Sequence, residues 1–221
     1  MRTFVRRCAL HICIPRSPCL KLRRIMWFSV VTIAFSLLQP YISHGTNLNR
    51  YAVNLGNCIG AVLSSEYLLV RSMCACLRID LYASVPNGSA IRVKERIPYT
   101  GDPACDGLTL LRLERNISIV SDLKPINLDC TNKAEALSYY LVGPKVRQRV
   151  NSVRCNCCKC EIEWKPNYPQ QAELLVQADE NSVVLRAIAT ALPQDGQTAQ
   201  FTQTSRYCSF VDHYLKRLVQ N

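Results

Sequence analysis

A series of short apolar segments, separated by turn signals, constrains the fold of this chain more than any other feature. Within these segments apolar residues run together or alternate with polar ones, as in strands with buried faces. They cover residues 59–63, 67–70, 77–81, 91–94, 108–113 and 137–142. Between them lie Pro86-Asn87-Gly88 and the Gly- or Pro-containing stretches 99–103 and 122–125. Many short strands with few helix signals predict an all-β barrel or sandwich.

The C-terminal residues carry a different pattern, that of an amphipathic helix. One face of this helix is apolar and is formed by Phe210, Val211, Tyr214, Leu215, Leu218 and Val219. Ser209 followed by Asp212 resembles a capping box at its start. Membrane binding is disfavoured because the polar face carries only two basic residues, Lys216 and Arg217. We expect the apolar face to pack on the sheets.

A hydrophobic leader precedes all of these segments. Residues 25–38 are apolar except for three hydroxyl side chains, follow Arg23-Arg24 and precede small residues at positions 43 and 45. This order is typical of a secretory signal, and the run is shorter than the roughly twenty residues of a membrane span. The sequence therefore predicts a secretory signal segment over residues 26–45, with an uncleaved signal anchor as the alternative. Residues 1–25 form a basic extension, and both Met1 and Met26 are candidate starts.

The positive charge of the chain is concentrated in this leader. The whole chain has 27 basic and 16 acidic residues, a net charge of +11. Seven of the basic residues and none of the acidic ones lie within residues 1–45, so twenty remain against sixteen, a balance of +4. A balance of this size gives no reason to expect nucleic acid as a partner. After removal of the signal, no membrane association is expected either.

The cysteines also point to export. Three of the 13 cysteines lie in the basic extension, and ten follow the leader, at positions 58, 74, 76, 105, 130, 155, 157, 158, 160 and 208. An even number in a secreted chain indicates disulfides. Two glycosylation sequons, at Asn87 and Asn116, agree with a secreted, extracellular glycoprotein. Only one histidine, His213, follows the leader, which excludes a metal site or a catalytic triad built on several histidines.

The densest group of cysteines is Cys155-Asn-Cys-Cys-Lys-Cys160. Thiolates at this spacing suit zinc or copper, so a cysteine-rich metal-binding protein is one interpretation. The other is a set of disulfides to distant cysteines, which an oxidising compartment favours because oxidation removes the thiolates. Cys157 and Cys158 are adjacent and hard to bridge to each other, so partners elsewhere are expected for at least two of the cluster. We expect no bound metal or cofactor.

Residues 58–74, Cys-Ile-Gly-Ala-Val-Leu-Ser-Ser-Glu-Tyr-Leu-Leu-Val-Arg-Ser-Met-Cys, resemble a block of the trypsin-like serine proteases, peptidase family S1. That block reads C-G-G-x-L-I-x-x-x-x-V-L-T-A-A-H-C and has the same cysteine spacing. Residues 108–113 are similar to the family's D-I-A-L-L-x-L, residues 114–126 to the strand running into its R-P-I-C-L, and residues 141–143 to its G-W-G approach. The resemblance covers about residues 51–143, and the terminal helix fits as well.

The resemblance implies a chymotrypsin-like double β-barrel, with a reduced second barrel and a C-terminal amphipathic helix. The first barrel half would cover residues 46–143, and the shortened second half with the helix would cover residues 144–221. Few residues lie between position 143 and position 170, where the family builds several strands. Whether residues 144–200 form a complete barrel stays open. The family's matching loop also implies a disulfide between Cys58 and Cys74.

The same alignment gives the positions of the family's catalytic triad, which needs a serine, a histidine base and a buried aspartate. The histidine position holds Met73, whose thioether accepts no proton near neutral pH. The aspartate position holds Gly107; Asp106 is one residue earlier and would face the other side of a strand. The serine position holds Gln170 or Gln171, and this stretch lacks the glycines of an oxyanion hole.

The resemblance and the substitutions together predict a secreted non-catalytic serine protease homologue, a pseudoprotease that acts by protein binding. Its expected partner is an extracellular protein, with an active serine protease among the candidates and a cofactor or decoy role in an extracellular protease cascade. One alternative is residual or relocated trypsin-like endopeptidase activity, in which a relocated pair would have to use His213. The other is the metal-binding protein centred on residues 155–160.

Overall fold

The structure is a computed structural model. It describes residues 47–76, 80–85, 88–102, 107–117, 122–131, 138–156, 158–165, 167–179, 182–191 and 198–218. The chain divides into two compact units, Met1–Gly45 and Thr46–Asn221, and every element below belongs to the second. The predicted extension and signal segment lie outside the described residues. Within the described residues, no helix combines the length and the apolar character needed to cross a membrane.

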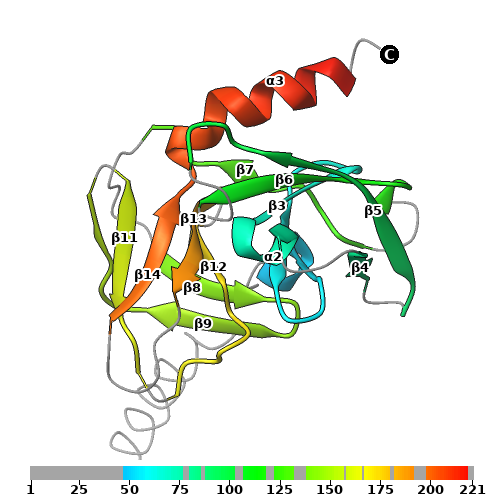
Figure 1. Cartoon of the computed structure of the whole chain (residues 1–221). Helices are drawn as coiled ribbons and strands as arrows, with labels where there is room; N and C mark the ends of the chain where they lie inside the picture. The colour runs from blue at the N-terminus through cyan, green and yellow to red at the C-terminus, as the bar shows by residue number, and fades with distance from the viewer. Residues whose placement is uncertain are drawn as a thin grey trace, which may run out of the picture. The chain divides into compact units, whose positions relative to one another are not determined.

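Six strands of the first half close into a barrel (Figure 1). Around the barrel their order is β1-β2-β3-β6-β5-β4, and all neighbouring pairs are antiparallel. The strands are β1 (Ala52–Asn54), β2 (Ile59–Val62), β3 (Tyr67–Arg71), β4 (Tyr82–Ser84), β5 (Ala90–Pro98) and β6 (Leu108–Leu113). A 3-10 helix, η2 (Leu48–Tyr51), precedes β1, and a short helix, α2 (Ser72–Cys76), follows β3.

The second half forms an open sheet in the order β10-β11-β14-β13-β12-β8-β9. Its strands are β8 (Ser138–Gly143), β9 (Val146–Val150), β10 (Arg154–Cys155), β11 (Lys159–Glu163), β12 (Leu174–Ala178), β13 (Val183–Ala191) and β14 (Thr198–Gln203). The short strand β7 (Asn127–Leu128) pairs in parallel with β13. Strand β8 belongs to this sheet, so the second sheet begins before the boundary that the sequence places at residue 143.

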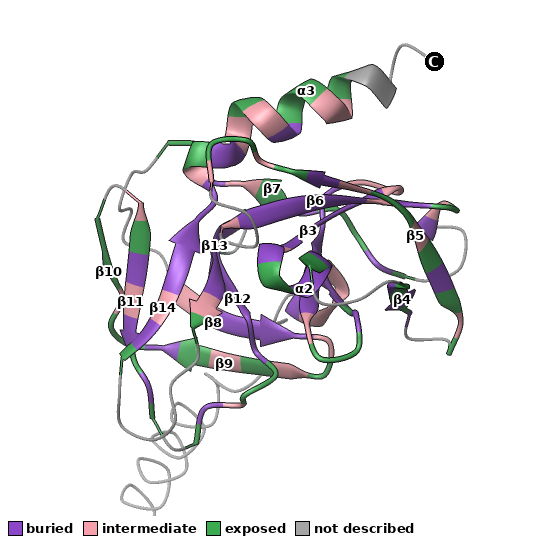
Figure 2. Ribbon diagram, viewed as in Figure 1, coloured by how far each residue is buried: buried purple, intermediate pink, exposed green. Residues whose placement is uncertain are grey.

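The closed barrel and the half-barrel formed by the second sheet, called the second barrel below, bury several of their strands on both faces, which explains the long apolar runs. In β3, Leu68 and Val70 point into the first barrel, whereas Tyr67 and Leu69 belong to a third cluster between the barrels. The same alternation in β12 places Leu175 inside the second barrel and its neighbours in the shared cluster. Figure 2 shows β3, β6 and β12 almost entirely buried, while β5 and β9 alternate.

The predicted fold class, all-β with two barrels and a terminal helix, is confirmed. Each predicted strand overlaps an observed one except that over residues 77–81. Residues 77–79 lie outside the described part, and strand β4 starts at Tyr82. Leu81 is nevertheless buried, and its carbonyl accepts a hydrogen bond of 2.9 Å from the Val93 amide. The predicted strand over residues 77–81 is therefore only tested at its end, where Leu81 bonds to β5 but lies outside β4.

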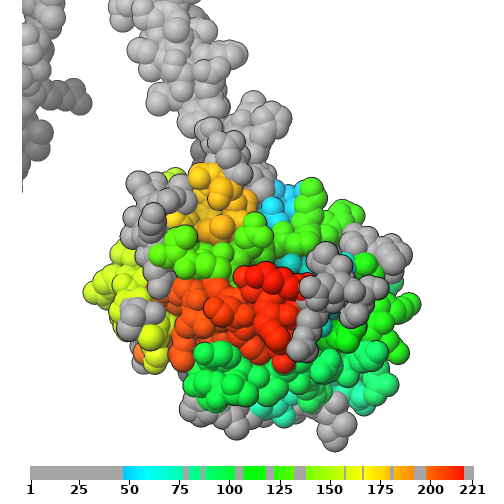
Figure 3. All heavy atoms as spheres, turned by 90° about the horizontal axis from the view of Figure 1, so that it is seen from above, coloured from blue at the N-terminus to red at the C-terminus, as the bar shows by residue number. Residues whose placement is uncertain are grey.

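The C-terminal segment is attached to the body by a disulfide and by edge-on contacts between aromatic rings. It contains a 3-10 turn, η4 (Ser205–Tyr207), and helix α3 (Cys208–Leu218), red in Figure 3. Cys208 is disulfide-bonded to Cys130. The ring of Tyr99 contacts those of Tyr207 and Phe210 edge-on, with centroids 5.0 and 5.4 Å apart. Of the predicted apolar face, Phe210, Val211, Tyr214 and Leu215 pack against the body, and the side chains of Leu218 and Val219 lie outside the described part.

Candidate binding cleft between the two barrels

A cleft of about 630 Å³ lies between the two halves of the domain. The first barrel contributes Asn54 and Ser84, and the second half contributes Lys145, Gln170, Gln171 and Glu173, all of which have side chains that can form hydrogen bonds. Apolar residues and glycines, among them Ala52, Ile59, Val85 and Pro144, make up the rest of the lining. The cleft can therefore bind a polar ligand.

Local turns bring these side chains to the cleft. In the β1–β2 turn, Gly56 has φ 87°, and its amide donates to Asn54 Oδ1 over 2.8 Å. On the opposite wall, Gly143 closes strand β8, and a Cβ atom there would overlap the carbonyl oxygen of Gln171. This close approach of two backbones requires glycine and places Gln171 beside the β8–β9 turn.

A buried carboxylate joins the two barrels beneath the cleft. Glu173 is 5% exposed, and its Oε2 accepts a hydrogen bond of 3.2 Å from the Ile59 amide of the first barrel. Burial raises the pKa of Glu173, while the guanidinium of Arg71 and the Ile59 hydrogen bond lower it in part. Arg71 Nη1 also donates to the Thr190 carbonyl over 3.3 Å. Glu173 of the second half thus bonds to the first half, and Arg71 of the first half bonds to the second.

The position of the family's histidine lies outside this cleft. Met73 stands on α2, is 45% exposed and is absent from the lining that the described residues form. The adjacent Ser72 is buried; its amide donates to the Gly107 carbonyl over 2.9 Å, and its hydroxyl shares a hydrogen bond of 2.8 Å with that of Thr109. The structure therefore brings positions 73 and 107, which the sequence alignment assigned to the family's histidine and aspartate, close together.

A buried aspartate lies beside Gly107, but it serves the C-terminal segment. Asp102 accepts a hydrogen bond from the Tyr207 hydroxyl and pairs with Arg206 over 3.1 Å. Burial, and then this hydrogen bond, raise the pKa of Tyr207. Gly107 has φ 72°, and a Cβ atom there would overlap the Asp102 carboxylate. Asp106, the alternative from the sequence, lies outside the described residues.

The remaining candidate catalytic residues do not come together. Gln170 and Gln171 are exposed and line the cleft, where an amide supplies hydrogen bonds but no nucleophile. His213 lies on the exposed side of α3, its ring edge-on to that of Tyr214 with centroids 5.3 Å apart. It is not among the described residues that line the cleft.

The cysteines are joined in pairs that the sequence only partly indicates. Cys58 and Cys74, the pair implied by the resemblance, form a disulfide. Cys155 and Cys160 bond to each other across β10 and β11 and not to distant cysteines. A strand pairing that places them directly opposite each other is the reason. The expectation of partners elsewhere for at least two of the cluster stays a prediction, since Cys157 lies outside the described residues. Among the described residues, no cluster of three or more acidic, histidine or cysteine side chains could hold a metal.

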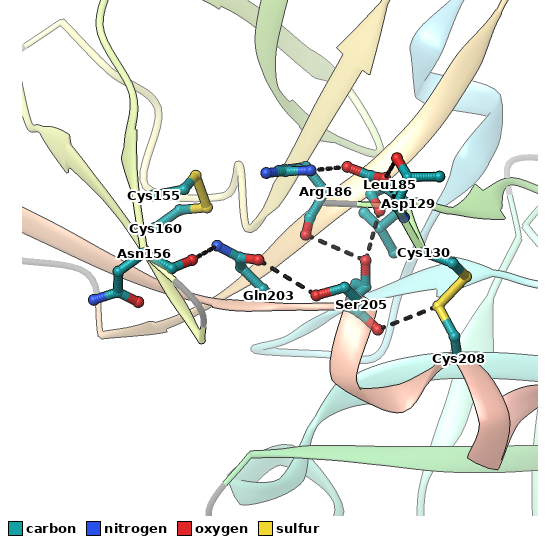
Figure 4. A network of polar contacts seen from close by, with 12 residues as sticks. Asp129, Cys130, Cys155, Asn156, Cys160, Leu185, Arg186, Gln203, Ser205 and Cys208 are labelled. Carbon is teal, nitrogen blue, oxygen red and sulfur yellow. Dashed lines mark hydrogen bonds and ion pairs between the residues drawn. A yellow bond between two sulfur atoms is a disulfide. The ribbon is translucent and has the colours of Figure 1, made fainter. Parts of the chain in front are cut away.

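Figure 4 shows a polar network that runs between two disulfides of the second half. At one end, the Gln203 side chain donates to the carbonyl of Asn156, in the loop closed by Cys155 and Cys160. At the other end, Thr204 Oγ1 donates to the Leu185 carbonyl over 2.7 Å, next to the bond between Cys130 and Cys208. The network holds the end of β14 and fixes the start of the terminal segment.

Two of the residues with the most informative contacts were missed by sequence reasoning. Glu173 and Arg71 each form a hydrogen bond to the opposite half of the domain, and nothing local in the sequence indicates these contacts. For Glu173 the sequence did hold one signal, because it is the single acidic residue in the otherwise apolar stretch 172–176. Of the predicted glycosylation sites, Asn87 lies outside the described residues, and Asn116 is half-buried just before the buried Ile117.

Comparison with known proteins places this geometry in a known fold. No protein-family model matches the chain, and no curated protein matches it. Among solved structures, kallikrein-related peptidase 10 matches with a TM-score of 0.58 and 16% identity, covering 75% of this chain and 95% of that one. Kallikrein-related peptidase 10 in complex with Zn2+ matches with a TM-score of 0.56 and 15% identity, covering 77% and 97%. Similarity at this level of identity concerns the fold alone. The described part of the chain therefore has the chymotrypsin-like double-barrel fold of the trypsin-like proteases.

Proposed function

We propose that this chain is a secreted, non-catalytic member of the chymotrypsin-like fold that binds another extracellular protein in the cleft between its barrels. The observation that carries the proposal is the combination of a formed cleft with non-catalytic side chains at the triad positions. The role fits a cofactor or decoy, and an active serine protease is a candidate partner.

The chemistry of the triad positions supports the absence of catalysis. Acyl transfer needs a nucleophile within hydrogen-bond reach of a base, and the base needs an orienting partner. The thioether of Met73 accepts no proton near neutral pH, and the amides of Gln170 and Gln171 attack no carbonyl. Asp102 is engaged by Tyr207 and Arg206, so it orients no base.

The chemistry of the cleft supports polypeptide binding. Amide side chains such as Asn54 and Gln171 offer one donor group and one acceptor each, which match the groups of a peptide backbone. Lys145 adds a positive charge at the rim, and Glu173 keeps its carboxylate below the floor. The disulfides support export, because such bonds persist in oxidising compartments.

The absence of catalysis is tested by producing the chain from Met26 in a secretory cell and exposing the secreted protein to a fluorophosphonate probe. We expect no covalent labelling and no cleavage of a peptide substrate panel, under conditions that label active trypsin completely. Stoichiometric labelling at one serine would overturn the proposal.

The binding role is tested with a panel of active trypsin-like proteases and a protein substrate. We expect the secreted chain to change the cleavage rate of at least one protease, and the change to disappear when Gln171→Trp fills the cleft. Lys94→Trp is the matched control, because Lys94 is exposed on β5 and does not line the cleft. An effect that both variants retain would show that the cleft is not the binding surface.

A further inference from the structure

One oxygen of the buried Glu173 carboxylate is open to the cleft. Glu173 is 5% exposed and lines the cleft. Its Oε2 accepts the hydrogen bond from the Ile59 amide, whereas no donor to its Oε1 occurs within the described part of the chain. The described residues contain four polar side-chain atoms that are fully buried and without a partner, and Oε1 is not among them. Solvent in the cleft therefore reaches Oε1.

The rest of the domain compensates this carboxylate only in part. Arg71 is the cation that acts on it, but Arg71 Nη1 donates to the Thr190 carbonyl, and among the described residues no ion pair joins Arg71 to Glu173. An ionised carboxylate has about four acceptor sites, and Glu173 receives one hydrogen bond. Burial accordingly raises the pKa of Glu173. A cationic donor brought to Oε1 would supply the missing compensation.

The apolar part of the lining suits the stem of a long side chain. Ile59, whose amide binds Glu173, lines the cleft together with Ala52, Val85 and Pro144. Carbon surface of this kind packs against methylene groups, while a charged end group reaches a polar partner. A lysine side chain combines a flexible aliphatic stem with a terminal ammonium. Its polarity therefore matches apolar walls with a carboxylate at their base.

We propose that the cleft binds a lysine side chain of a partner protein, with the lysine Nζ donating to Oε1 of Glu173. A compact ammonium fits a single open oxygen, whereas the planar guanidinium of arginine binds best when it meets both oxygens of a carboxylate. Here the second oxygen is held by the Ile59 amide. This inference rests on the proposed binding role and adds the side-chain chemistry of the partner.

The ammonium of Lys145 does not prevent such an occupant. Lys145 is the other charged residue among the described residues that line the cleft, and it is exposed, so water and salt screen its repulsion. An acidic ligand could pair with Lys145, but an exposed pair contributes little, and the added negative charge would oppose that of Glu173. The buried carboxylate therefore decides the class of ligand more than the exposed ammonium does.

The test measures binding of synthetic peptides to the whole secreted chain by fluorescence anisotropy. The probe is a labelled nonapeptide, blocked at both ends, with one central lysine among alanine, serine and threonine. We expect it to bind about tenfold more tightly, or better, than the same peptide with Nε-acetyl-lysine, which keeps the stem and loses the charge. It should also bind more tightly than the arginine peptide. This comparison uses the unaltered protein, so a misfolded variant cannot confuse it.

The variant Glu173→Gln locates the bound ammonium. Glutamine keeps an acceptor for the Ile59 amide but has no charge, so the lysine and acetyl-lysine peptides should bind this variant with affinities within about twofold of each other. The matched control, Glu163→Gln, removes the same charge from an exposed residue of β11 that does not line the cleft, and it should keep the full preference. A single cooperative thermal transition in both variants shows that the fold persists.

Three results would overturn the inference: equal binding of the lysine and acetyl-lysine peptides, a lysine preference that survives Glu173→Gln, or loss of the preference in the control variant. Binding of pentylamine as tight as that of the lysine peptide would also overturn it, because the site would then take a free amine and not a protein. The proposed function fails separately, by fluorophosphonate labelling or by unchanged protease rates. If only the lysine preference is absent, while Gln171→Trp still abolishes the effect on a protease, the proposed function stands.

Discussion

Removal of the Asp129 carboxylate should cost this fold far more than removal of a surface carboxylate. Asp129 and Arg186 form an ion pair in which the two side chains are only 7% and 4% exposed (Figure 4). The other Asp129 oxygen accepts hydrogen bonds of 3.0 Å from the amide and the hydroxyl of Thr131. The pair sits beside Cys130, at the point where the chain enters the disulfide to Cys208.

The magnitude follows from what Asp129→Ala leaves behind. Burial lowers the pKa of Arg186, but a guanidinium stays charged in proteins, so the variant would hold an unpaired buried cation. Breaking a buried pair in this way costs about 3–5 kcal/mol. The Arg186 Nε has no hydrogen-bond partner among the described residues, so Asp129 is a large part of its compensation.

The assay is urea unfolding of the secreted, deglycosylated domain, with thermal unfolding in parallel. At about 2–4 °C per kcal/mol for a domain of this size, Asp129→Ala should lower Tm by roughly 6–20 °C. The double variant Asp129→Ala with Arg186→Leu should recover most of the loss, because it removes the unpaired charge. The control is Asp80→Ala, whose pair with Arg92 is 55% and 57% exposed, and its cost should stay below about 1 kcal/mol.

Two results would refute this reasoning. If Asp129→Ala lowered the free energy of unfolding no more than Asp80→Ala, the buried ion pair would contribute no more to stability than an exposed one. If the double variant were as unstable as the single one, the loss would come from the Thr131 hydrogen bonds or from packing, and not from an isolated guanidinium. An unchanged m-value in urea is required for either comparison, because a change would report on the unfolded state.

Two further predictions concern the surroundings of the cleft. Gly107→Ala should lower stability by about 1–2 kcal/mol more than Gly88→Ala in urea unfolding: both have positive φ, but only the Cβ at position 107 would overlap Asp102. Because burial raises the pKa of Glu173, unfolding free energy should fall as pH rises from the unfolded carboxyl pKa through the raised folded one. Glu173→Gln should flatten this decline, and a parallel pH profile would contradict the buried carboxylate as its source.

Local sequence patterns predicted the strands because the burial of a strand's residues determines which of its positions are apolar. The run over residues 108–113 predicts β6 because its residues are buried toward the barrel interior or toward the other half. The spacing of Phe210, Val211 and Tyr214 predicts α3 for the same reason. The loop between Cys58 and Cys74 came only from the family resemblance, since spacing alone leaves the pairing of ten cysteines open.

The contacts between distant segments could not be predicted in this way. Asp102 and Tyr207 are 105 residues apart, and Glu173 and Ile59 are 114 residues apart, so no periodicity links them. Strand β8 was placed with the first half because the family resemblance extends to residue 143. Its register with β12 decides otherwise, and this register depends on a sheet whose other strands come later in the chain.

If the chain is non-catalytic, as we propose, the places of residues 73, 170 and 171 in the structure explain how the fold can persist. Met73 is exposed, and Gln170 and Gln171 lie on the surface of the cleft, so their side chains contribute little buried area. The contacts that hold the halves together use other residues, among them Glu173, and an apolar cluster that includes Leu69 and Val176. A chain under selection for binding alone would therefore be free to change the catalytic positions, while changes in the shared core would cost several kcal/mol each.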